Sequence, residues 1–145
     1  MDIKLGKPAH GWLPVTIEHE GKNWQFDVSD VPVDPVSTLV TVLSSLFTGR
    51  NGEVWWHLEP DGYYLDFKVQ DDNCKVSLEF SDESRKARSD CIFEFEDSIE
   101  NIVVPLWREI KKFHSHDYNE PHWPPINKNE VRALTEHVKE LQNKG

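Results

Sequence analysis

The chain has 145 residues and a formal net charge of −10, and its composition excludes several classes of protein. Its length suits one domain over residues 1–145, and its shares of 37% hydrophobic and 11% aromatic residues are typical of a globular chain rather than a disordered one. Because such an excess of carboxylates repels nucleic acid and anionic membranes, we expect neither as a partner, and we expect attraction to basic proteins.

The negative charge is concentrated in the middle third of the chain. Residues 53–100 hold fourteen acidic and five basic residues, whereas residues 1–52 hold six and four, and residues 101–145 hold six and seven. A partner attracted by this charge should therefore meet the part of the fold that the middle third builds.

Two features predict the compartment. The opening MDIKLGKPAHGW lacks the apolar core of a secretory signal, and no stretch is apolar and long enough to span a bilayer. We therefore expect a cytoplasmic protein in which Cys74 and Cys91 are reduced, with a single disulfide between them as the alternative.

The first elements predicted along the chain are a hairpin and a helix. Residues 15–20 and 23–28 alternate in polarity around Gly21, which predicts two strands joined by a tight turn. Asp34 is a good N-cap and Pro35 a good first residue for a helix whose apolar positions recur from Val36 to Phe47.

Four further strands are predicted over residues 52–58, 63–69, 74–80 and 91–96. A turn over residues 59–62 separates the first two, and a polar loop over residues 81–90 separates the last two. Alternation assigns these residues to the inward face: Val54, Trp56, Phe67, Cys74, Leu78, Cys91 and Phe93.

Two helices end the chain. Asp97 or Ser98 caps the first, whose apolar stripe runs from Ile99 to Phe113, and Asn127 caps the second. The order β-β-α-β-β-β-β-α-α with hairpin-length connections predicts an α+β fold: an antiparallel sheet of about six strands with three helices mainly on one face.

The other face of that sheet is the predicted functional surface. Acidic residues should surround a few exposed rings there, an arrangement that suits a basic and partly apolar protein partner. We expect the contact residues to be Glu18, Asp27, Glu53, Trp55, His57, Tyr64, Asp66, Glu79, Glu94 and Glu96, with Ile92 among them.

The stretch FHSHDYNEPHWPPIN, residues 113–127, offers a different hypothesis. His114, His116 and His122, with Asp117 and Glu120, are residue types that bind Zn²⁺ or Ni²⁺. Their spacing matches no metal motif, and PHWPP favours an extended polar connection between two helices. A metal-dependent enzyme or metal-binding protein is therefore an alternative, and our main expectation includes no metal.

Catalytic signatures are missing from the sequence. It holds no GxSxG motif, no HExxH motif and no phosphate-binding glycine loop, and both cysteines fall in predicted strands. We therefore expect a protein that is not an enzyme and needs no cofactor.

A compact acidic domain with six tryptophans and no catalytic motif resembles the bacterial immunity proteins of interbacterial toxin systems, and HGWLPV, residues 10–15, is similar to a recurrent opening. In that class the protein binds a toxin domain, often a basic nuclease, and blocks its active site. The resemblance implies a stoichiometric inhibitor, and we expect the chain to be a monomer or a homodimer. A dimerising or ligand-binding module of another kind is the further alternative.

Overall fold

The computed structural model describes residues 1–83 and 90–144. In these residues the fold is α+β, as predicted, with the element order β-β-β-α-β-β-β-β-α-α. The strands are β1 (Asp2–Leu5), β2 (Trp12–His19), β3 (Lys22–Ser29), β4 (Gly52–His57), β5 (Gly62–Gln70), β6 (Asn73–Ser81) and β7 (Asp90–Ser98). The helices are α1 (Pro35–Leu46), α2 (Ile99–Ser115) and α3 (Lys128–Lys144).

Two parts of this order differ from the prediction. Strand β1 was not predicted, because four residues are too few to establish a period of two. The two strands extend into the loop that was predicted over residues 81–90, because β6 ends at Ser81 and β7 begins at Asp90. Residues 84–89 lie outside the described part of the chain.

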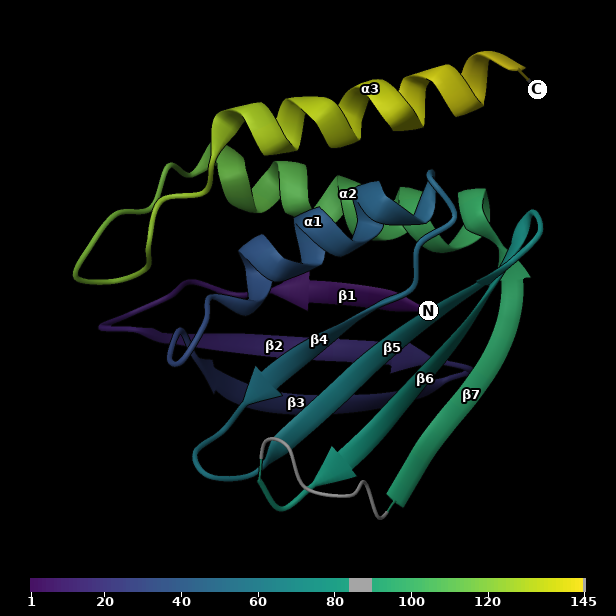
Figure 1. Ribbon diagram of the computed structural model, residues 1–145. Helices are drawn as coiled ribbons and strands as arrows, with labels where there is room; N and C mark the ends of the chain where they lie inside the picture. The colour runs from purple at the N-terminus through teal and green to yellow at the C-terminus, as the bar shows by residue number, and fades with distance from the viewer. Residues whose placement is uncertain (84–89, 145) are drawn as a thin grey trace.

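The described strands form two antiparallel sheets and not one, in the orders β1-β2-β3 and β4-β5-β6-β7. Their inner faces are joined by aromatic contacts: Phe26 stacks on Tyr63 at 4.8 Å between ring centroids, and Trp24 lies 5.3 Å from Phe93. Figure 1 shows the β4–β7 sheet in front of the β1–β3 sheet, with the helices together above both.

The helices begin where their capping residues predict. The Asp34 carboxylate accepts the Val36 N–H at 2.9 Å at the start of α1, and the Ser98 hydroxyl accepts the Asn101 N–H at 3.1 Å at the start of α2. Asn127 Oδ1 accepts the Asn129 N–H at 2.8 Å before α3. Figure 1 shows α3 on the far side of α1 and α2 from the strands.

One hydrophobic core lies between the sheets and the helices. Its largest fully buried side chains include Trp56, Phe67 and Leu78 from the β4–β7 sheet, Leu39 and Leu43 from α1, and Leu106 and Ile110 from α2. The predicted inward face of β4, β5 and β6 is thereby confirmed. Phe93 of β7 is half-buried, and its ring meets Trp24 and His19.

Candidate protein-binding surface

The outer face of the β4–β7 sheet is the surface that the acidic middle third builds. The strand registers place these predicted contact residues on it: Glu53, Trp55, His57, Tyr64, Asp66, Glu79, Glu94 and Glu96. Lys68, Lys75 and Ser77 share the face. Figure 1 shows the helices beyond the upper ends of these strands and not over this face.

Glu18 and Asp27 do not belong to the same surface, and this part of the prediction was wrong. Glu18 lies in β2 and Asp27 in β3, and both alternate away from the inner face that meets the β4–β7 sheet. They are on the outer face of the other sheet, so they face away from Trp55. The cause is the division into two sheets, which alternation within single strands cannot reveal.

The centre of the surface is more closely packed than the sequence suggested. Tyr64 and Asp66 are each 7% exposed, although both were expected to stand in solvent. The Trp55 ring lies 4.5 Å from the Tyr64 ring and 5.6 Å from the His57 ring, measured between centroids. The three rings form a row along the β4 edge of the face, with Trp55 and His57 half-buried. We call Tyr64, Trp55 and His57 the aromatic row.

Carboxylates surround this row and the middle of the sheet. The outward positions of the four strands hold five acidic residues and two basic ones. The acidic residues are Glu53, Asp66, Glu79, Glu94 and Glu96, and the basic ones are Lys68 and Lys75. Glu94 pairs with Lys75 at 3.1 Å with both side chains well exposed, and Glu96 accepts a hydrogen bond from the Asn73 amide at 3.2 Å. Exposed interactions of this kind contribute little to stability, so Glu94 and Glu96 can still attract a basic partner.

A β-bulge changes which residue of β7 joins the surface. The register shifts between Leu78 and Glu79, so Glu79 stands opposite Cys91. Cys91 is exposed, and Ile92 is half-buried against the core, the reverse of the two predictions. Cys74 is buried on the inner face and both thiols are free, which excludes the disulfide that the sequence left open.

His57 connects the surface to a loop that was not predicted to belong to the binding surface. Its Nδ1 forms a short hydrogen bond with the carbonyl oxygen of Val31, in the segment between β3 and α1. Val31 and Val33 of this segment are exposed, and so is Trp12 at the start of β2. The signal that could have found the two valines is the apolar pair in VPVDP, which fits neither a strand nor a helix.

The three histidines of the metal hypothesis point to different neighbours. His116 stacks on Tyr118, His122 Nδ1 accepts the backbone N–H of His10 at 3.3 Å, and His114 faces a small depression beside Pro124. Within residues 1–83 and 90–144, no three His, Cys, Asp or Glu side chains are arranged to hold a metal ion. The segment connects two helices, and its fully buried Trp123 packs in the core.

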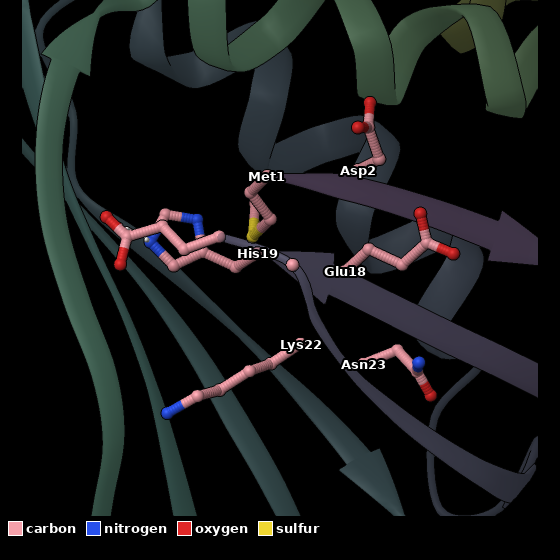
Figure 2. Close-up of a pocket in the computed structure, with 8 residues that line it drawn as sticks. Met1, Asp2, Glu18, His19, Lys22 and Asn23 are labelled. Atoms are coloured by element: carbon pink, nitrogen blue, oxygen red, sulfur yellow. Dashed lines mark ion pairs between the residues drawn. The ribbon is translucent and has the colours of Figure 1, made fainter.

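A cavity of about 360 Å³ lies at the β2–β3 hairpin, and of the predicted contact residues Glu18 is among those that line it. Figure 2 shows Asp2, Glu18 and Asn23 on one side of it and His19 and Lys22 extending toward the strands of the other sheet. His19 lies 4.6 Å from Phe93 and 4.4 Å from Phe95, measured between ring centroids. Burial lowers the pKa of His19, the nearby N-terminal amino group adds to the shift, and Glu20 opposes it.

Comparison of the chain with known protein families, with curated proteins and with solved structures finds no match. None of the helices formed by the described residues combines the length and apolarity that a membrane crossing requires.

Proposed function

We propose that this protein is a stoichiometric inhibitor that binds a basic protein domain through the outer face of its β4–β7 sheet. The partner we propose is a toxin domain of the nuclease type, as the resemblance to immunity proteins implies. The observation that carries the proposal is the aromatic row Tyr64–Trp55–His57 set among five carboxylates on a face that no helix covers within the described residues.

Charge and contact area have different roles in this proposal. Long-range attraction between carboxylates and a basic partner speeds encounter, and it weakens as salt screens the charges. Trp supplies a large contact area with few rotatable bonds, so the half-buried Trp55 holds the complex once it has formed, and the buried Tyr64 supports its ring. Because Trp55 already stacks on Tyr64, little side-chain freedom remains to be lost when a partner binds.

A nuclease is the partner chemistry that best suits such a surface. An enzyme that cleaves nucleic acid binds phosphates with Lys and Arg, so its active-site region presents positive charge. A protein that places carboxylates over that region competes with the nucleic acid and needs no catalysis of its own. This function also agrees with the sequence, which holds no catalytic motif.

The test is a pull-down of the partner from the native host, followed by a salt titration of the captured complex. We expect a one-to-one complex that abolishes nuclease activity and whose association rate falls as salt is added. Trp55→Ala should weaken binding by about 2 kcal/mol, mainly through faster dissociation. Glu96→Gln should slow association, whereas Glu136→Gln, an equal change of charge on exposed α3, should have little effect.

Two results would contradict the proposal. One is a captured partner that carries no excess of basic residues. The other is a complex whose affinity responds to Glu136→Gln as strongly as to Glu96→Gln, because overall charge and not this face would then be responsible.

A further inference from the structure

Exposed large hydrophobic side chains gather at one end of the described molecule. They are Trp12, Val31 and Val33, with 40%, 56% and 63% of their surface exposed. Trp12 pairs with Ser29 where β2 begins and β3 ends, and the two valines follow Ser29 in the segment before α1. Three such side chains at one end differ from the scattered single apolar residues that are normal on surfaces.

The backbone that carries these side chains is held in place. The Asp30 N–H donates to the Gly11 carbonyl at 3.1 Å, which ties the segment to the residue before Trp12. The Val31 N–H donates to the Ser29 hydroxyl at 3.0 Å, and Asp34 fixes the far end as the cap of α1. A partner that binds here therefore meets side chains on an ordered backbone, which lowers the entropy cost of binding.

The apolar end continues into the candidate surface. The Val31 carbonyl bonds to the His57 ring, and that ring lies 5.6 Å from Trp55, measured between centroids. The backbone of Val31 therefore borders the aromatic row at the end of β4. A single partner could cover the aromatic row and Val31 at its edge.

The charges near this end select the kind of partner. The Asp30 carboxylate lies beside Gly11, the residue before Trp12, and Asp27 projects beside Pro14 from the outer face of the β1–β3 sheet. With a formal net charge of −10, two copies of the chain repel each other, whereas a basic protein is attracted. Carboxylates next to exposed apolar side chains complement an apolar pocket bordered by Lys or Arg.

We propose that Trp12, Val31 and Val33 form an apolar anchor at the end of the molecule next to the aromatic row, and that this anchor inserts into an apolar pocket on the basic partner. The inference rests on the proposed function, because the same partner is attracted by the carboxylates and held by this anchor. Interfaces concentrate their binding energy in a few desolvated apolar or aromatic contacts, and charged rims mainly set the rate of encounter.

The test uses two synthetic peptides of equal positive charge, one of arginine and leucine and one of arginine and serine, added to isotope-labelled protein in an NMR titration. We expect the leucine peptide to bind roughly tenfold more tightly and to shift the amide signals of Val31 and Val33 and the indole signal of Trp12. The double variant Val31→Ser with Val33→Ser should remove this tenfold preference. Ala133→Ser, at an exposed position of α3, should keep it.

The outcomes distinguish failure of the anchor from failure of the proposed function. Equal binding of the two peptides would overturn the anchor and leave charge-driven capture of a basic partner intact. Binding of neither peptide would remove the charge-based support for both. A dimer in ultracentrifugation that the double valine variant dissociates would show that a second copy, and not a basic partner, occupies the anchor. Both valines are exposed, so the double variant should unfold at the wild-type temperature, which a melting curve verifies.

Discussion

The indole N–H of Trp123 donates a 3.1 Å hydrogen bond to Oδ1 of Asp34, a residue 89 positions earlier in the chain. The same oxygen accepts the Val36 N–H at 2.9 Å, and Oδ2 accepts the Ser37 hydroxyl at 2.9 Å. One carboxylate therefore caps α1 and also fastens the segment between α2 and α3. The fully buried Trp123 ring supplies the apolar part of this attachment.

Replacing Asp34 by Ala should cost more than the loss of an ordinary cap. A lost N-cap costs about 0.5–2 kcal/mol, and a buried indole N–H left without an acceptor costs about 1–3 kcal/mol. We expect a loss of about 2–4 kcal/mol in the free energy of unfolding, measured with urea. Asn127→Ala is the matched control, because the side chain of this exposed cap of α3 accepts the nearby backbone N–H groups of Asn129 and Glu130, and its loss should cost about 1 kcal/mol. Equal losses for the two variants would show that the bond to Trp123 contributes nothing.

The elements of the fold were predictable where a local signal exists. The caps at Asp34, Ser98 and Asn127 are read from residues next to each helix, and the inward positions of β4 to β6 follow from alternation. The attachment of Trp123 to Asp34 has no local signal, since it joins residues brought together only by the complete fold.

The candidate site was predictable in part, for the same reason. Strand alternation placed Trp55 and Glu94 correctly on one face, but it could not show that Glu18 belongs to another sheet. The bulge after Leu78 exchanged the positions of Cys91 and Ile92, because one extra residue inverts all alternation beyond it. The burial of Tyr64 and Asp66 depends on neighbours across the sheet and not on their own strand.

His19 should make the protein less stable in mild acid. Burial between the sheets lowers its pKa from the usual 6.5, so the folded state binds a proton less readily than the unfolded state. The stabilising contribution of neutral His19 is fully present above pH 6.5 and is lost as the pH falls toward the lower pKa of the folded protein.

Melting temperatures between pH 7 and pH 5 measure this contribution. His19→Phe keeps a ring against Phe93 and Phe95 and removes the titrating group, so its melting temperature should fall less over this range than that of the wild type. His137→Phe, on α3, is the control for the loss of any one histidine. If both variants show the wild-type slope, His19 is not the responsible group.

Gly62 should not tolerate a side chain. A Cβ at this position would overlap the carbonyl oxygen of Trp56 and lie 2.7 Å from Cη2 of Trp55. Because the carbonyl is part of the β4–β5 pairing, Gly62→Ala should force the strands apart and cost about 3 kcal/mol in the free energy of unfolding. Gly21→Ala is the comparison: its Cβ has no atom within 4 Å, and only its φ of +78° is unfavourable, so about 1–2 kcal/mol is expected. A smaller loss at Gly62 than at Gly21 would contradict the close contact.

The two cysteines should react with a thiol reagent very differently at pH 8. Burial raises the pKa of Cys74 to about 11, and Glu96 adds to this shift, so the thiol is both inaccessible and protonated. Cys91 is exposed; its pKa is raised by partial burial and then by Glu94 and Glu79. We expect one thiol to react in the folded protein and two after unfolding in urea, with mass spectrometry assigning the first to Cys91.

Glu94→Gln should speed the reaction of Cys91, because it removes a negative charge that disfavours the thiolate and releases Lys75 from its ion pair. Glu136→Gln on α3 should leave the rate unchanged. Reaction of Cys74 at a similar rate in the folded protein would show that the inner face of β6 opens readily. Exposure of Cys91 beside Glu94 also provides a direct assay of the candidate surface, since a bound partner that covers this face should slow the labelling of Cys91.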